Sequence, residues 1–247
     1  MTLDTRTLLF VGWMALPLAA QDSATPATEA PDAPDAGLKA ELEALAEKLD
    51  GIRDLTTDFE EQKFSTLLKK PLVSKGKMRV VGVRSRWDTM SPKPSSMVVD
   101  PAEIRIYYPD RSTVEVYRVD EKLKWLTVWP LPNLSVLVVR FFIERIPVAE
   151  SRDTYSVGPW LGLRLRPRDE VVGEYLRLVD VVLNTATALV VRVEILDADG
   201  DRTVISFSNA RTNIGLDEKD VELVVPAGTQ TVRPLAKLEK EPPDARP

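Results

Sequence analysis

Most of the chain alternates apolar and polar residues with a period of two. Ile104, Ile106 and Tyr108, for example, alternate with Glu103 and Arg105. This pattern is typical of strands with one apolar and one solvated face. The candidate strands, not all of which need form, are residues 55–64, 75–83, 84–90, 96–100, 104–108, 113–116, 123–128, 161–166, 174–183, 189–196, 203–208 and 221–225. About ten or eleven antiparallel strands in one domain predict a mainly β (α+β) fold, a barrel or strongly curled sheet, because closure removes exposed edges.

Apolar residues at the start of the domain recur with a helical period instead. Five apolar residues recur at spacings of four, three, four and three, with Lys and Glu on the other side: Leu38, Leu42, Leu45, Leu49 and Ile52. This spacing predicts one amphipathic helix whose apolar stripe packs on the sheet. Asp50-Gly51 supplies its C-terminal end, because glycine tolerates the left-handed conformation that ends helices.

The segment Leu134–Ile143 departs from both patterns, since eight of its ten residues are large and apolar. Asn133, just before it, is a residue type suited to a helix N-cap. Apolar side chains on every side indicate burial on every side. A central strand, a buried core helix and a short displaceable helix over the mouth of a barrel all fit this segment, and the pattern does not choose between them.

The ends of the chain differ from its middle. In residues 1–20 Arg6 precedes an apolar run that ends in Leu18-Ala19-Ala20, the pattern of a cleavable secretory signal. Residues 21–37 are almost wholly Ala, Asp, Pro, Thr, Glu and Ser, which predicts a disordered linker. Residues 237–247 have the same character, so we expect one folded domain over residues 38–236.

The amino-acid composition and net charge exclude several classes of functional site. The 247 residues include no cysteine and no histidine, which excludes disulfides, thiol nucleophiles and histidine-dependent triads. The net charge of -5 argues against nucleic-acid binding. The adjacent acids Glu60 and Glu61 point to opposite faces of a strand, so they cannot work as an acid–base pair. The Asp197/Asp199/Asp201 series lacks the glutamate that ends a calcium loop and predicts a solvated hairpin turn. We expect neither an enzyme nor a metal or other cofactor.

Five short segments follow one another through most of the domain. They are the strand Leu55-Thr56-Thr57-Asp58-Phe59-Glu60-Glu61-Gln62, the segment Ser74-Lys75-Gly76-Lys77-Met78, the Trp strand Ser85-Arg86-Trp87-Asp88, the segment Ile104-Arg105-Ile106-Tyr107-Tyr108-Pro109-Asp110 and the closing Val221-Glu222-Leu223-Val224-Val225-Pro226-Ala227-Gly228. In their order and spacing these segments resemble the outer-membrane lipoprotein carrier (LolA) family.

The resemblance implies an unclosed antiparallel barrel, with helices as lids over a hydrophobic cavity that receives lipoprotein acyl chains. It implies a periplasmic, monomeric carrier that works between an inner-membrane ABC-type transporter and an outer-membrane receptor. A non-transporting lipid-sensing or regulatory module on the same fold is the alternative. The expected cavity residues are those on the dry strand faces: Leu55, Phe59, Trp87, Ile104, Ile106, Val114 and Val116.

The lid is expected in the apolar segment, through Leu134, Leu137, Val138, Phe141 and Phe142. In the family, an arginine of an Arg-Pro pair before the Trp strand latches the lid. This chain reads Val81-Gly82-Val83-Arg84 there, so the pair is absent, and Arg84 and Arg86 are the candidates for a replacement latch.

Overall fold

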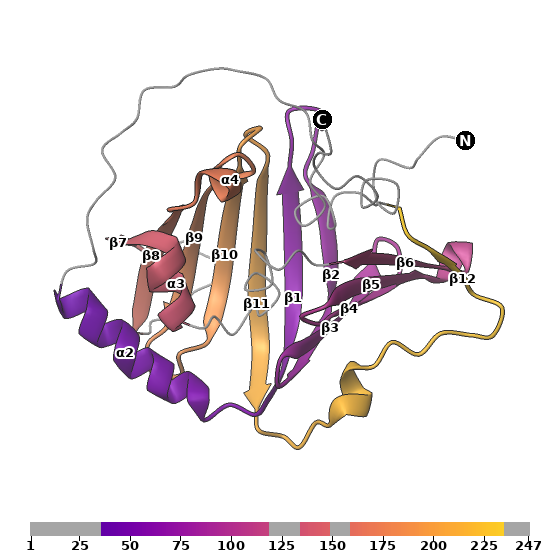
Figure 1. Ribbon diagram of the computed structural model, residues 1–247, viewed down its shortest axis with the longest axis horizontal. Helices are drawn as coiled ribbons and strands as arrows, with labels where there is room; N and C mark the ends of the chain where they lie inside the picture. Colours follow the sequence, from indigo (N-terminus) through magenta and orange to yellow (C-terminus); the bar gives the residue numbers. More distant parts are fainter. Residues whose placement is uncertain (1–35, 119–133, 149–158, 235–247) are drawn as a thin grey trace, which may run out of the picture.

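The computed structural model describes residues 36–118, 134–148 and 159–234. Within these ranges twelve strands form a single unclosed, curled sheet, which confirms the mainly β fold predicted from the alternation (Figure 1). The strands are β1 (Asp54–Phe64), β2 (Leu72–Val81), β3 (Arg84–Ser91), β4 (Ser95–Val99), β5 (Glu103–Tyr108), β6 (Thr113–Arg118), β7 (Phe141–Ile146), β8 (Trp160–Pro167), β9 (Leu176–Asn184), β10 (Val190–Asp197), β11 (Arg202–Thr212) and β12 (Gln230–Val232).

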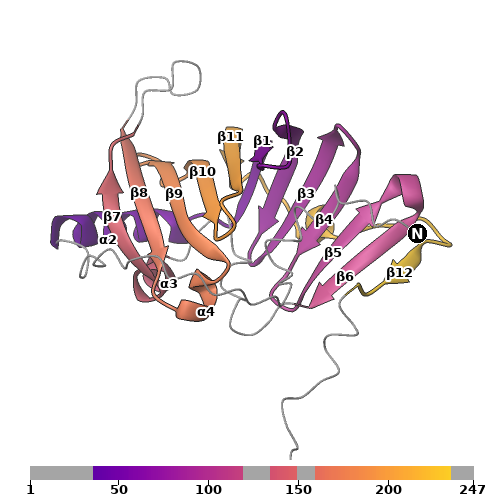
Figure 2. The ribbon, with the colours of Figure 1, turned by 90° about the horizontal axis from the view of Figure 1, so that it is seen from above.

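The sheet consists of two meanders joined at its centre. Strands β1–β6, the first wing, and strands β7–β11, the second wing, each pair consecutive neighbours antiparallel, and β1 pairs with β11 between them. The short strand β12 adds to β6 in parallel, so β12 and β7 are the outermost strands. Figure 2 shows the row of strands from above.

Three α-helices accompany the sheet in the described ranges: α2 (Ala36–Asp50), α3 (Leu134–Arg140) and α4 (Glu170–Gly173). The predicted stripe of α2 is confirmed, because Leu38, Leu42 and Leu45 are buried in the core cluster. The helix begins at Ala36, two residues inside the predicted linker. In Figures 1 and 2, α2 and α3 lie on the same face of the second wing.

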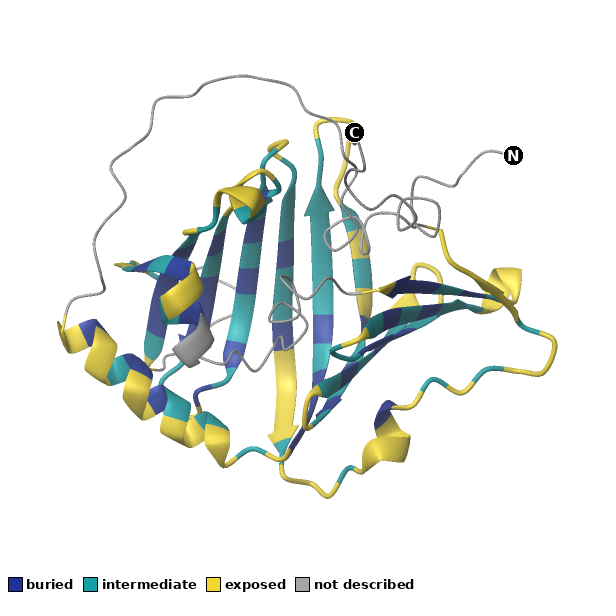
Figure 3. Ribbon diagram, viewed as in Figure 1, coloured by how far each residue is buried: buried dark blue, intermediate teal, exposed yellow. Residues whose placement is uncertain are grey.

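Strand register divides the sheet into two chemically different faces. The inner face carries most of the core cluster, including Leu163 of β8, Val181 of β9 and Val193 of β10 (Figure 3). The outer face carries ion pairs between neighbouring strands, such as Lys77 with Asp58 at 2.8 Å. One strand therefore supplies both faces, which is why the sequence alternates.

The apolar segment 134–143 is not one element. Residues 134–140 form α3, and β7 begins at Phe141, where pairing with Pro167 of β8 starts. The junction is fixed by a backbone hydrogen bond from the Arg168 N–H to the Arg140 carbonyl at 2.9 Å. Phe141 and Phe142 thus lie in a strand and not in the lid helix.

The strand predicted over residues 221–225 is wrong. A short 3-10 helix, η3 (Glu218–Val221), ends at the first of these residues, and residues 222–225 form no strand. A reciprocal capping box of Asp217 and Asp220 fixes the first turn of η3. Residues 213–229, which we call the C-terminal strap, continue without strand pairing to β12 and run along the outside of the first wing in Figure 1. Val221 is fully buried, so this apolar residue packs in the interior without being part of a strand.

Asp54 fixes the start of the strap. Its buried carboxylate accepts hydrogen bonds from the backbone N–H groups of Ile214 and Gly215, at 2.8 and 3.1 Å.

The predicted signal, most of the predicted linker, the predicted tail and the strand predicted over 123–128 lie outside the described residues. Of the helices that the structure describes, none has the length and apolar character of a membrane span.

Candidate functional site: a hollow on the inner face of the first wing

An aromatic cluster forms the floor of a hollow on the inner face. The Phe59 ring on β1 contacts the Trp87 ring on β3 edge-on, with centroids 5.1 Å apart, and Trp87 meets Phe207 of β11 at 6.1 Å. Gly76 of β2 makes this possible, because a Cβ there would lie 2.7 Å from the Phe59 ring and 2.2 Å from the Asp88 carbonyl. The glycine therefore marks a close approach of ring and backbone.

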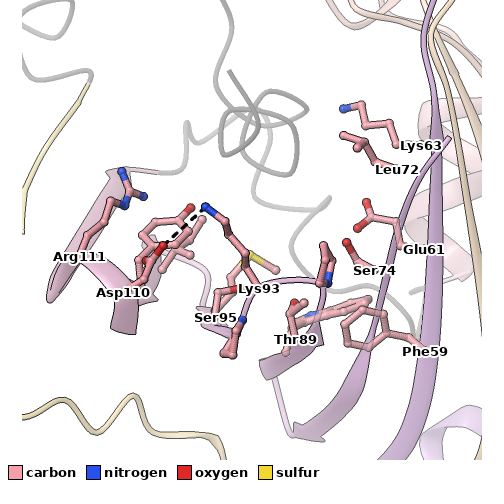
Figure 4. A pocket seen from close by; sticks show the side chains of 16 residues that line it. Phe59, Glu61, Lys63, Leu72, Ser74, Thr89, Lys93, Ser95, Asp110 and Arg111 are labelled. Carbon is pink, nitrogen blue, oxygen red and sulfur yellow. Dashed lines mark ion pairs between the residues drawn. The ribbon is translucent and has the colours of Figure 1, made fainter. Parts of the chain in front are cut away.

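The hollow above this floor has a volume of about 280 Å³. That is close to the lower end of ligand pockets, which begin at about 300 Å³. Its lining is apolar at the base and polar at the rim (Figure 4), and consists of Phe59, Glu61, Lys63, Leu72, Ser74, Trp87, Thr89, Pro92, Lys93, Pro94, Ser95, Met97, Ile106, Tyr108, Asp110 and Arg111.

Charged groups gather at the rim beside the β5–β6 turn. Lys93 Nζ lies 3.8 Å from an Asp110 carboxylate oxygen (Figure 4). The Arg111 guanidinium lies 4.2 Å from the centroid of the Tyr108 ring and 3.4 Å from a Glu115 carboxylate oxygen. An amphiphile whose apolar part rests on the aromatic floor would place its polar part among these charges.

Glu61 is the acidic residue of the hollow wall. It projects from β1 beside Ser74, its register partner on β2 (Figure 4). Burial raises the pKa of Glu61 to about 7, against a smaller opposing effect of Lys63. Burial also lowers the pKa of Lys63, two residues further along the same face. Glu60 faces outward and pairs with Lys75 at 2.7 Å, so the two glutamates do lie on opposite faces.

The predicted cavity residues divide into three groups. Phe59, Trp87 and Ile106 line the hollow. Leu55 and Ile104 belong to the same core cluster but do not line it. Val114 and Val116 are on the opposite face.

Register explains the misplaced valines. In the β5–β6 pairing Val114 stands opposite Tyr107 and Val116 opposite Arg105, whereas Ile104 stands opposite Tyr117. Directly opposed residues share a face, so both valines face outward and are buried there. The assignment of Val114 and Val116 to the cavity is a sequence prediction that the register contradicts.

Arg84 and Arg86 do not face the hollow either. Trp87 of the same strand faces inward, so its neighbour Arg86 faces outward, where it donates to the Glu222 carbonyl of the strap at 2.8 Å. Arg84 pairs with Glu218 of η3 at 3.5 Å. These contacts hold the C-terminal strap on the outer face, and the predicted latch role is not supported.

The predicted lid residues are split between two elements, because Leu134, Leu137 and Val138 belong to α3 whereas Phe141 and Phe142 belong to strand β7. Leu137 of α3 is buried in the core cluster and Val138 is half-buried, while the side chain of Leu134 lies outside the described set. Phe141 is buried in the same cluster. Phe142 opposes Arg166 on the outer face, and the Arg168 guanidinium lies 3.9 Å from its ring centroid.

Sequence reasoning missed the rim of the hollow. Lys93 lies in the β3–β4 turn and Asp110 and Arg111 in the β5–β6 turn, where no periodic pattern indicates which way a side chain points.

The outward arginines of β8 are largely neutralised, since Arg164 pairs with Asp180 at 2.6 Å and Arg166 with Glu144 at 2.9 Å. Asp197, Asp199 and Asp201 occupy the predicted hairpin turn between β10 and β11, and the structure's described ranges hold no cluster of acidic side chains suited to a metal.

Comparisons with known proteins agree with the predicted resemblance. No family model matches the chain. A curated relative, the outer-membrane lipoprotein carrier protein of Bordetella avium, is 27% identical over 148 residues, which are 60% of this chain and 65% of the relative. The match therefore spans less than two thirds of that protein.

Two solved structures superpose on the chain at low identity. An uncharacterized conserved protein from Thermus thermophilus superposes with a TM-score of 0.50 and 10% identity, covering 80% of this chain and 99% of the other. A LolA superfamily protein from Nitrosomonas europaea gives 0.41 and 10%, covering 75% and 97%. On the sequence match, the chain is similar to the outer-membrane lipoprotein carrier family, as its motifs predicted.

Proposed function

We propose that this protein is a carrier, not an enzyme, and that it binds acyl chains of lipoproteins, or of a related amphiphile, in the inner hollow. The observation that carries the proposal is the aromatic floor of Phe59 and Trp87 beneath a charged rim. Such a site buries an apolar chain and leaves a polar group near solvent. The name of the Bordetella relative supports the same cargo class.

The free energy of burying an acyl chain favours a movable element that covers the hollow and is displaced when cargo binds. Each buried methylene contributes about 0.8 kcal/mol, so a chain of about sixteen carbons would gain about 13 kcal/mol. A carrier must also release its cargo, so part of this gain has to be offset by breaking contacts within the protein. A hollow of about 280 Å³ is small for such a chain. A neighbouring element must therefore move to make room for the cargo.

Helix α3 is our candidate for that cover. It has seven residues, too few for a stable isolated helix. Of its described side chains only Leu137 is fully buried, and Val139 is 69% exposed. Moving α3 would therefore break the core contacts of Leu137 and uncover apolar side chains on the inner face of the second wing, which supplies the required offset and extends the hollow.

The remaining expectations complete the proposal. Residues 1–20 would direct export to the periplasm and be removed there. An inner-membrane ABC-type transporter would load the carrier, and an outer-membrane receptor would be the acceptor.

Two neighbouring residues of β2 allow a matched test of the hollow. Ser74 lines it, and Val73 faces outward on the same strand. In Ser74→Trp the added indole should occupy the hollow and weaken binding of a fluorescent fatty-acid probe by about tenfold or more, equivalent to about 1.4 kcal/mol. Val73→Trp should bind the probe like the unmodified protein.

Mass spectrometry of a solvent extract from the purified native protein tests the cargo class. Stoichiometric lipid or lipopeptide is expected from the extract.

Equal probe affinity in Ser74→Trp and Val73→Trp would refute the hollow as the binding site. Saturable probe binding without any native lipid would instead favour a lipid-sensing module.

A further inference from the structure

The tip of the β1–β2 hairpin exposes apolar surface. Leu67 is 89% exposed, the highest value among the large hydrophobic residues that the structure describes. The turn that presents it is ordered: the Leu67 N–H donates to Ser65 Oγ at 3.3 Å, and the Leu68 N–H donates to the Ser65 carbonyl at 3.0 Å. Leu67 is therefore held in solvent by an ordered turn, whereas the other leucines whose burial the structure describes are buried or half-buried.

This tip stands above the mouth of the hollow. Strand β2 begins at Leu72, three residues before its first pairing with β3 at Lys75, so the hairpin extends beyond the β3–β4 turn. On the other side β11 begins opposite Phe64, at the end of β1. Below the tip, Lys63 and Leu72 line the hollow itself (Figure 4), so the tip and the site are continuous.

The charge of the tip is positive. Lys69 and Lys70 follow Leu67 closely, are exposed, and have no carboxylate partner among the described residues. The adjacent β10–β11 turn is acidic, with Asp197, Asp199 and Asp201. An anionic surface would thus be attracted to the β1–β2 tip and repelled by its neighbour, which confines contact to the tip.

We infer that residues 65–71 dock the carrier on an anionic lipid bilayer, with Leu67 entering the interfacial zone and Lys69 and Lys70 contacting headgroup phosphates. The inference rests on the proposed function, because its purpose is to bring the mouth of the hollow to the membrane. One leucine and two lysines on a narrow turn are far too small for a stable protein interface, which buries about 1,200 Å² or more. They suit weak, reversible adsorption, which a shuttle needs.

The absence of cysteine allows a direct test. Thr66→Cys places a single thiol in the tip, and Val83→Cys places one in the β2–β3 turn at the opposite end of the same strand. Each variant carries an environment-sensitive fluorophore and is titrated with vesicles of equal parts phosphatidylcholine and phosphatidylglycerol. A blue shift is expected from the label at residue 66 only, and it should disappear with pure phosphatidylcholine vesicles or in high salt.

Two variants separate the charge from the apolar contact. In the double variant Lys69→Gln, Lys70→Gln, vesicle affinity should fall about 25-fold, since each basic residue near an anionic surface contributes about fivefold. Leu67→Ser should weaken vesicle binding with the lysines intact. Both variants should bind the fatty-acid probe normally, because neither changes the lining of the hollow.

Equal responses of the two labels, including no shift of either, would overturn membrane docking, and so would vesicle binding unaffected by the lysine replacements. If the tip instead contacts a protein acceptor, neither label should shift on vesicles. Normal probe binding in these circumstances would leave the carrier proposal intact, whereas loss of probe binding by the unmodified protein would refute the carrier itself.

Discussion

At the scale of single residues, adjacent glutamates occupy opposite environments. Glu61 faces the apolar hollow, which raises its pKa to about 7, whereas Glu60 faces outward and the Lys75 ammonium lowers its pKa. A carboxyl whose pKa is higher in the folded than in the unfolded chain destabilises the protein once it ionises. Glu61 therefore costs stability as the pH rises from about 4.5, its unfolded value, through about 7.

We predict that Glu61→Gln stabilises the protein at pH 8 by about 1 to 2 kcal/mol and has little effect near pH 4. Glu60→Gln, the matched control, should have the opposite sign at pH 8, with a loss of about 0.2 to 1 kcal/mol because it removes a surface ion pair. Urea unfolding at the two pH values measures both. A pH-independent effect of Glu61→Gln would contradict the assigned environment.

The two phenylalanines of β7 are also expected to differ. Phe141→Ala removes a ring from the core cluster and should cost about 3 to 5 kcal/mol. Phe142→Ala removes a half-buried ring of the outer face and its contact with Arg168, and should cost about 1 kcal/mol. Denaturant midpoints of the two variants provide the comparison, and similar losses would argue against their placement on opposite faces.

Residue-level alternation predicted much of this arrangement. It placed Phe59, Trp87 and Ile106 on one dry face, because a period of two is a property of each strand alone. It failed for Val114 and Val116, because these two valines are buried on the outer face of the first wing, so that face is also dry there. Which dry face is the inner one depends on pairing between strands, and no single strand carries that information.

At the scale of elements, the apolar segment shows a second limit of periodicity. Residues 134–143 are apolar on all sides whether they form a helix or a strand, so the change at Phe141 left no trace in the pattern. The ladder with β8 decides where the helix ends. Likewise, the capping box of Asp217 and Asp220 fixes a 3-10 helix that ends at Val221, where alternation had predicted the closing strand to begin.

The role of α3 as a cover gives a prediction of its own. Leu137→Ser removes the buried anchor of the helix, and should weaken the closed state more than the sheet beneath it. The variant should stay folded and bind the fatty-acid probe more tightly, because fewer internal contacts have to break before cargo enters. Circular dichroism and probe titration on one sample measure both properties. A folded variant with unchanged or weaker probe affinity would exclude α3 as the cover.

At the scale of the whole molecule, export is the first expectation. The intact mass of native protein should correspond to a chain that starts at or near Gln21, after the short apolar run. Soluble native molecules that mostly retain Met1 would contradict both the signal and the periplasmic location. The same measurement on protein kept in the cytoplasm serves as the control.

The arrangement of two meanders has a consequence for how the protein reaches its native state. Every pairing inside a wing joins strands that are neighbours in the chain, so each wing can form by short loop closures. The pairings β1–β11 and β6–β12 instead join segments more than a hundred residues apart, and both need strands near the C-terminal end. Such distant closures are slow steps in folding. A chain whose C-terminal part is not yet available can therefore assemble its first wing, but the centre of the sheet must wait for β11.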